Sequence, residues 1–258
     1  AAVGYEAMDN VDASTVRTVK IAIKELGDEI YPDEAVLAEM VAEAHARGFQ
    51  VAVHAVAERA VAAAVAAFEG ALARQPRPDH SFDSAQDKRH RIEHCGLCPP
   101  DLARRIGSLG LTVVTQPSFL YHNGDRFLRQ VAPQVQPHLY PLRSLAQAGA
   151  RLAASSDCPV VPPDPIAGIY GAVARRSKGG QRLPGEETLD VHMAVAMHTR
   201  DAARAAFLDE ERGVIAAGMA ADLVLLSADP TTVEAEELAG LRVEMTLSEG
   251  RVAWRAGG

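Results

Sequence analysis

Short apolar runs alternate with longer amphipathic stretches from about residue 18 to residue 206. Uniformly apolar runs of this length, separated by helix-like stretches, are typical of a parallel sheet covered by helices on at least one face. The five predicted strands span about residues 18–23, 50–54, 91–94, 111–116 and 150–156. The pattern therefore predicts an α/β fold, either the later part of a (β/α)₈ barrel or a doubly wound sheet.

Helix start and stop signals bound the stretches between these strands. Pro32 and Asp33 open a predicted helix that runs to about Arg47 and ends at Gly48. Similar signals predict helices at about residues 58–74, 101–110 and 139–148, whereas residues 75–88 are expected to form a polar surface loop. After Phe207 the pattern changes to that of β-structure, with a predicted strand at 221–226 and a hairpin over 242–254.

Composition and charge narrow the class of protein. Hydrophobic residues make up 48% of the chain, and no run approaches the roughly 18 apolar residues of a membrane span. The formal charge of −8 disfavours nucleic acid and anionic membranes as partners, because both need a basic face. No signal peptide is expected, and three cysteines suit a reducing cytoplasm. Because the chain opens on Ala1 instead of Met, this ground alone leaves open that its beginning is missing.

Three predicted strands finish on a side chain that can bind a metal. His54 and His94 end the second and third strands, and the fifth runs into Asp157. The carboxyl ends of parallel strands meet at one mouth, so two imidazoles and a carboxylate there predict a divalent-metal site. Read singly, each histidine suits a structural hydrogen bond and Asp157 a turn cap, and only their shared placement favours the site. Lys20, inside an apolar strand, is the fourth candidate, and it could be salt-bridged, near a chain edge or modified.

Several segments resemble family 3 of the amidohydrolase superfamily, the branch that includes N-substituted formamide deformylases. Residues 51–60 resemble its VAVHAIGDRA segment, residues 89–94 its RHRIEH strand and residues 154–160 its GSDAPV segment. Residues 213–226 are similar to its G-I-x-x-G-x-x-AD-L-V-V-L tail, where the chain leaves the barrel for a β-sandwich. The resemblance implies a partial (β/α)₈ barrel over residues 1–207, with strands four to eight, and the C-terminal segment of the small β-sandwich domain over residues 208–258.

The resemblance also implies roles for individual residues. His54 and His94 would be metal ligands, Asp157 both ligand and general base, and Lys20 a carboxylated ligand that bridges two metals. The substrate would meet Gln116 and a loop over residues 119–126, which includes Tyr121, Asn123 and Arg126. Zinc is the expected ion, one or two per site, with iron or manganese as alternatives.

The His-x-His pair of the superfamily's first strand is absent, because no two of the nine histidines are separated by one residue. The resemblance implies hydrolysis of a non-peptide C–N bond in a small-molecule amide, formamide or cyclic amide. Because the His-x-His pair is absent, this activity is expected of a longer protein that also contains the N-terminal half. The alternative is a catalytically inactive fragment or partner subunit, which could dimerise through the open barrel edge. A phosphotriester or lactone substrate is a weaker alternative, since fold and ligands do not fix the substrate.

Other polar motifs predict structural roles. Cys95 and Cys98 form a lone C-x-x-C, which disfavours a zinc ribbon. His192 and His198 lie in an alanine-rich predicted helix and are interpreted as structural. The basic run Arg175-Arg176 with Lys178 is expected to be a solvated helix end, not a nucleic-acid patch.

Overall fold

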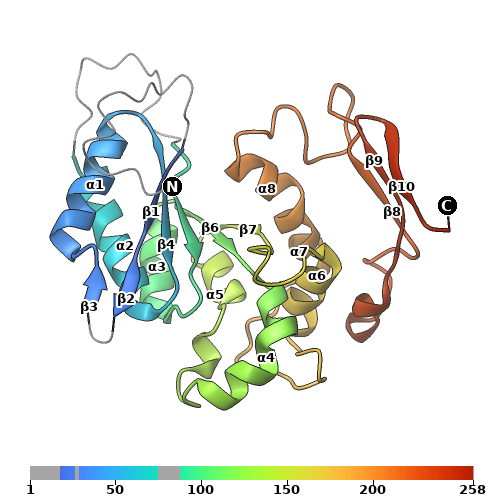
Figure 1. Cartoon of the computed structure of the whole chain (residues 1–258), viewed down its shortest axis with the longest axis horizontal. Helices are drawn as coiled ribbons and strands as arrows, with labels where there is room; N and C mark the ends of the chain where they lie inside the picture. Colours follow the sequence, from blue (N-terminus) through green and yellow to red (C-terminus); the bar gives the residue numbers. More distant parts are fainter. Residues whose placement is uncertain (1–17, 27–28, 75–87, 258) are drawn as a thin grey trace. The chain divides into compact units, whose positions relative to one another are not determined.

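The computed structural model describes residues 18–26, 29–74 and 88–257 of the chain (Figure 1). Its main sheet has five strands in the order β1-β4-β5-β6-β7, and the registers given for β1 with β4, β4 with β5 and β5 with β6 are all parallel. These strands are β1 (Thr18–Ala22), β4 (Gln50–Ala55), β5 (Arg91–His94), β6 (Thr112–Thr115) and β7 (Arg151–Ala154). The predicted α/β fold with a parallel sheet is thereby confirmed. The predicted surface loop over residues 75–88 lies outside the described residues, apart from Lys88.

The chain divides into two compact units, and the boundary passes through β6 and β7. The first unit comprises residues 1–114 and 144–151, and the second comprises residues 115–143 and 152–258. The division of the chain at residue 207 that the sequence suggests stays a prediction.

Helices α1 (Glu34–Ala46) and α2 (Glu58–Leu72) pack against each other in the first unit and both contact β4 (Figure 1). Asp33 caps α1, because its carboxylate accepts a hydrogen bond from the Val36 N–H at 2.9 Å. Gly48, at φ 87°, follows the end of that helix. The start and stop signals read from the sequence therefore act where they are predicted. A short antiparallel hairpin of β2 (Lys24–Leu26) and β3 (Glu29–Tyr31), which the sequence pattern does not predict, precedes α1.

Helix α3 (Pro100–Ser108) completes the described helices that lie wholly in the first unit. Arg105 of α3 forms a two-pronged ion pair with Glu69 of α2, with nitrogen–oxygen distances of 2.9 and 2.8 Å. Gly107 lies so close to the Ala148 backbone that a Cβ atom there would stand 1.9 Å from the Ala148 carbonyl oxygen. This helix is therefore positioned by close backbone contact as well as by side chains.

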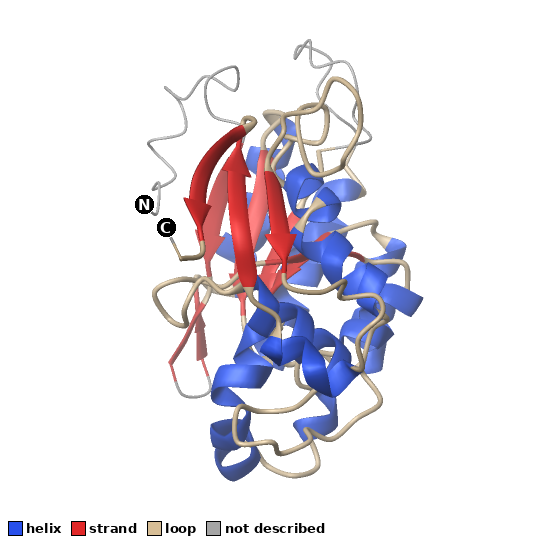
Figure 2. Ribbon diagram, turned by 90° about the vertical axis from the view of Figure 1, so that its right-hand side faces the viewer, coloured by secondary structure: helices blue, strands red, loops and turns tan. Residues whose placement is uncertain are grey.

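The second unit combines helices with a three-stranded antiparallel sheet, and Figure 2 distinguishes helices from strands by colour. The sheet order is β10-β9-β8, which matches the predicted strand and hairpin near the C-terminus. The strands are β8 (Leu223–Leu226), β9 (Val243–Ser248) and β10 (Arg251–Arg255). The helices are α4 (Ser118–Gln130), α6 (Pro165–Ala174), α7 (Val191–His198), α8 (Arg200–Ala205) and the short η2 (Gln136–His138) and η3 (Ala235–Gly240), while α5 (Leu142–Gln147) spans the boundary.

The predicted loop over residues 119–126 is wrong, because all of these residues lie within α4. The sequence Asn123-Gly124-Asp125 has the composition of a turn. In the structure Gly124 is needed for a close helix contact, since a Cβ there would stand 2.8 Å from the Ser177 Cβ. Asp125 is fixed by the same neighbour, because the Ser177 hydroxyl donates to its carboxylate at 2.6 Å.

The expectation that Arg175 is a solvated helix end is also wrong. Arg175 follows α6 in the left-handed conformation, with φ 49°, and its side chain is fully buried at 0% exposure. Its guanidinium donates to the backbone oxygens of Leu139, Tyr140 and Pro184 at 2.8–3.3 Å. Burial lowers the pKa of Arg175 to about 10, which still leaves the group charged at neutral pH. The buried Arg175 side chain therefore links separate backbone segments by hydrogen bonds.

Candidate metal centre

Two imidazoles meet at the carboxyl ends of neighbouring parallel strands. His54 lies at the penultimate position of β4 and His94 is the last residue of β5, where it is registered opposite Ala55. The His94 Nε2 and His54 Nδ1 atoms are 2.8 Å apart, and the rings meet edge to face with centroids separated by 4.4 Å. His94 is buried and His54 is half-buried. The structure therefore brings these two predicted ligands together.

The geometry of this pair fits two ligands of a divalent ion. Imidazole nitrogens bind zinc at about 2.0–2.1 Å, so two of them in a tetrahedral site stand about 3.3 Å apart. The observed 2.8 Å separation is about 0.5 Å shorter, so the two nitrogens would have to move apart by that amount to hold an ion. No group of three or more His, Cys, Asp or Glu side chains that could hold a metal occurs among the described residues. The role of the histidine pair as metal ligands therefore stays a prediction.

Asp157 follows β7 in the chain and belongs to the second compact unit, whereas both histidines belong to the first. Its backbone is in the left-handed conformation at φ 54°, its side chain is exposed, and its carbonyl oxygen accepts the Val160 N–H at 2.9 Å. The positive φ marks a sharply turned backbone directly after the strand. The predicted role of Asp157 as ligand and base stays a prediction.

Lys20 occupies the middle of β1, an end strand of the five-stranded sheet, in register with Ala52. Its side chain is exposed, so the cost of burying an unpaired ammonium does not arise. The end position of β1 in the sheet agrees with one of the alternatives left open by the sequence, a position near an edge. Carboxylation of Lys20 and metal binding by it stay predictions.

The predicted substrate contacts differ in their accessibility. Gln116, just after β6, is buried, and its amide donates to the Ser155 hydroxyl at 2.9 Å. Tyr121 lies half-buried on α4, where its ring packs edge to face against Tyr170 with centroids 5.5 Å apart. On the same helix Asn123 is half-buried and Arg126 is exposed. Gln116 is therefore engaged within the fold, while the α4 side chains can reach a ligand more easily.

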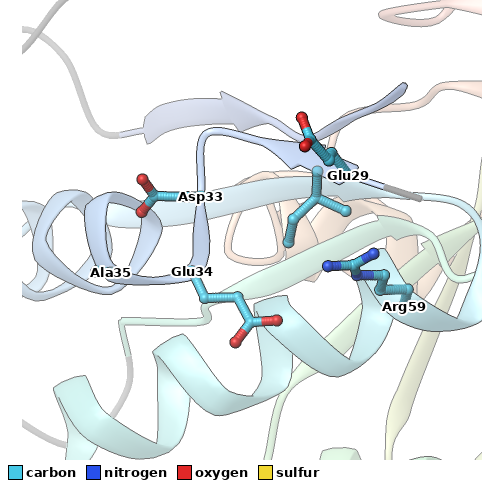
Figure 3. Close-up of a pocket in the computed structure, with 6 residues that line it drawn as sticks. Glu29, Asp33, Glu34, Ala35 and Arg59 are labelled. Atoms are coloured by element: carbon cyan, nitrogen blue, oxygen red, sulfur yellow. The ribbon is translucent and has the colours of Figure 1, made fainter. Parts of the chain in front are cut away.

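A polar pocket of about 450 Å³ lies in the first unit, among elements that follow β1 and β4 at their carboxyl ends (Figure 3). Arg59 reaches it from the first turn of α2, and Glu29 reaches it from β3. The other lining residues are Ile30, Asp33, Glu34 and Ala35. None of these residues is among the predicted site residues, because no motif assigns them a role. The sequence does contain a signal for Arg59, since this residue stands five positions after His54 in the segment over residues 51–60 that resembles the family motif.

The C-x-x-C cysteines and His198, for which the sequence predicts structural roles, are packed inside the protein. Cys95 and Cys98 are both buried and free, and their hydrogen bond together with burial raises the pKa of the Cys95 thiol. A raised thiol pKa opposes the thiolate form that a metal requires. Burial lowers the pKa of His198 to about 4, and its ring lies against Gly168, where a Cβ would stand 2.5 Å from the His198 Nε2. Both observations support the structural interpretation.

A model of the amidohydrolase family matches residues 7–254 of the chain. Among curated proteins, the N-substituted formamide deformylase of Arthrobacter pascens is 29% identical over 82% of this chain and 38% of its own length. The protein LONG AFTER FAR-RED 3 of Arabidopsis thaliana is 31% identical over 76% of this chain and 32% of its own length. The chain thus spans less than two fifths of the length of these two relatives.

Solved structures share the fold. An uncharacterized metal-dependent hydrolase from Pyrococcus horikoshii OT3 superposes with a TM-score of 0.64 at 22% identity, covering 88% of this chain and 44% of that chain. A Xaa-Pro dipeptidase with bound methionine gives a TM-score of 0.64 at 15% identity, covering 93% of this chain and 55% of that chain. Among the described residues, no helix is both long enough and apolar enough to cross a membrane. With the family match extending over nearly its whole length, the chain belongs to the amidohydrolase family.

Proposed function

We propose that the chain is the carboxyl-terminal part of a metal-dependent hydrolase that cleaves a non-peptide C–N bond in an amide, formamide or cyclic amide. The observation that carries the proposal is the meeting of the His54 and His94 ring nitrogens, 2.8 Å apart, at the carboxyl ends of two parallel strands. Active sites of barrel enzymes lie at this end of the sheet. Membership of the amidohydrolase family supports the same reading.

In this proposal His54 and His94 hold a divalent ion, with zinc favoured by their imidazole ligands. Bound there, the ion supplies a Lewis acid that polarises the substrate carbonyl and lowers the pKa of water. Asp157 takes the proton of the attacking water and delivers it to the leaving nitrogen. Lys20, in carboxylated form, is a further proposed ligand for a second ion.

Substrate contacts are proposed on two surfaces. Tyr121, Asn123 and Arg126 present polar atoms from α4, and Arg59 with Glu29 lines the polar pocket beyond β4. Both suit a small polar molecule as the substrate. The free state of all three cysteines supports a reducing cytoplasm as the compartment.

The second candidate is an inactive fragment or partner subunit. It is favoured by the absence, among the described residues, of any metal-binding group with three or more ligands. The fold likeness to a Xaa-Pro dipeptidase, at 15% identity, leaves the choice between peptide and non-peptide bonds to experiment.

Hydrolysis by the zinc-loaded protein, in which this chain is completed by the proposed N-terminal half, tests the proposal. The substrates are an N-substituted formamide, a linear amide, a cyclic amide and a Xaa-Pro dipeptide. We expect metal-dependent turnover of at least one non-peptide substrate, and a fall of about 10²-fold or more in Asp157→Asn, because a general base contributes about 10²–10⁴-fold. His192→Ala is the matched control, since His192 is an exposed histidine on α7. Turnover of the dipeptide alone would overturn the bond class, and no turnover at all would support the inactive reading.

A further inference from the structure

The two strands that carry His54 and His94 hold a second imidazole pair at their opposite, amino-terminal ends. His90 immediately precedes β5, and His45 lies in the last turn of α1. The His45 Nδ1 and His90 Nε2 atoms are 2.8 Å apart, and the Val51 N–H of β4 donates to His90 Nδ1 at 2.9 Å. Together these contacts connect α1, β4 and the start of β5.

The hydrogen bonds fix where each ring carries its proton. Because Val51 donates to His90 Nδ1, that nitrogen must be unprotonated, and the neutral ring carries its proton on Nε2. The His90 Nε2–H then donates to His45 Nδ1, so His45 carries its proton on Nε2. A second proton on either ring would convert an accepting nitrogen into a donor that faces another donor. The His90 nitrogens are both engaged in this arrangement, which leaves none to ligate a metal.

Among the described residues, the surroundings of the two rings disfavour a positive charge. Both rings are buried, at 6% and 5% residue exposure, and Phe68 of α2 stacks on His90 with centroids 5.5 Å apart. Burial first, and the nearby Lys88 second, lower the pKa of His45 to about 4. Burial, His45 and Lys88 lower the pKa of His90 to about 3.

Carboxylates on the helices that pack around the two rings form ion pairs with other residues. On α1 the Glu43 carboxylate pairs with Arg47 at 2.7 Å, and on α2 the Glu69 carboxylate pairs with Arg105 of α3 at 2.8 Å. The Lys88 ammonium donates to the His45 carbonyl oxygen. Beside His90, the backbone oxygen of Arg89 accepts from the Gln50 amide at 2.7 Å. Among the described residues, Lys88 is the cation that lowers the pKa of both imidazoles, because its ammonium repels a further positive charge.

We propose that the His45–His90 pair is an acid-sensitive lock: in the neutral form it ties α1 to β4 and β5 at the amino-terminal end of the sheet, and protonation of either ring releases that end. The stabilisation is fully present above pH 6.5, the ordinary pKa of histidine, where both folded and unfolded states are neutral. As the pH falls from 6.5 towards the folded values of about 4 and about 3, the unfolded state binds protons that the folded state refuses.

Hydrogen exchange at the Val51 amide measures the lock directly, because this N–H makes the bond to His90. Each histidine raises the opening equilibrium about 30-fold between pH 7.5 and pH 5, so the pair raises it about 10³-fold. We expect the Val51 protection factor, which is corrected for the intrinsic pH dependence of exchange, to fall by that amount in the chain. A protection factor that stays within about threefold over this range would overturn the proposal.

Two further measurements separate the lock from general acid sensitivity. In His90→Gln the amide can still accept from Val51 and donate to His45 without titrating, so the pH-dependent change should shrink to about 30-fold. His192→Gln, which alters an exposed histidine, should keep the full change. Nitrogen-15 NMR of the wild-type chain should show His90 as the neutral Nε2–H form at pH 5. An Nδ1–H form, or a His90 that titrates near pH 6.5, would overturn the proposal even if the variants fail to fold.

Discussion

Arg175→Ala is expected to lower the free energy of unfolding by about 3 kcal/mol or more, because it removes a buried guanidinium that donates to the backbone oxygens of Leu139, Tyr140 and Pro184. Each buried acceptor that loses its partner costs about 1–3 kcal/mol, and the truncated side chain also leaves a cavity. Urea unfolding of the second compact unit, followed by tryptophan fluorescence, measures the change. Trp254, the chain's single tryptophan, lies in that unit.

Two variants give this prediction its controls. Arg175→Lys keeps the charge but replaces a five-donor fork with a single ammonium, so we expect a loss between those of wild type and Arg175→Ala. Arg129→Ala removes an exposed arginine of α4 in the same unit and should change the stability by less than about 0.5 kcal/mol. Equal stability of Arg175→Ala and Arg129→Ala would contradict a stabilising role for the buried hydrogen bonds of Arg175.

Gly107→Ala and Gly70→Ala are expected to shift stability in opposite directions, although both replace a glycine inside a helix of the first unit. At Gly107 the new Cβ would stand 1.9 Å from the Ala148 carbonyl oxygen, so backbone must move, at a net cost of about 1–3 kcal/mol. At Gly70 nothing lies within 4 Å of the new atom, and the higher helix propensity of alanine should stabilise by about 0.5–1 kcal/mol. Thermal unfolding monitored by circular dichroism compares the two. A shift of the same sign in both would count against the close packing of α3.

The parallel sheet could be predicted from the sequence because its strands are short and most of them are mainly apolar, β4 above all. The strands predicted at residues 50–54 and 91–94 coincide with β4 and β5 to within about one residue at each end, and the cap at Asp33 and the stop at Gly48 locate α1. These signals are local, so a single sequence carries them. The hairpin of β2 and β3 lacks such a signal, since three-residue strands are too short to show a period.

The errors at α4 and Arg175 have a common cause. In both places the decisive contact comes from a segment distant in sequence: Ser177 against Gly124, and the Leu139 and Pro184 carbonyl oxygens around Arg175. Local composition favours a turn at the glycine and solvent at the arginine. Tertiary packing overrides both preferences.

In the candidate site, too, some contacts could be predicted from local sequence signals and others could not. The meeting of His54 and His94 follows from the rule that parallel strands end at one edge, so two strand-end histidines sufficed to predict it. The His45–His90 pair joins a helix end to a strand start, and no spacing in the sequence announces that contact. The pocket around Arg59 is lined in part by β3 of the β2–β3 hairpin. Because the sequence does not predict that hairpin, it does not predict the pocket either.

Zinc affinity tests the central claim, the metal site at His54 and His94, most directly. Competition with a chromophoric chelator should be measured for the wild-type chain, for His54→Ala and His94→Ala, and for the exposed-histidine control His192→Ala. We expect the wild type and the control to bind zinc with the same affinity. Each site variant should bind it more weakly, by about 10-fold or more, because either change removes one of two converging ring nitrogens. Zinc bound equally well by all four proteins, or by none, would contradict the central claim.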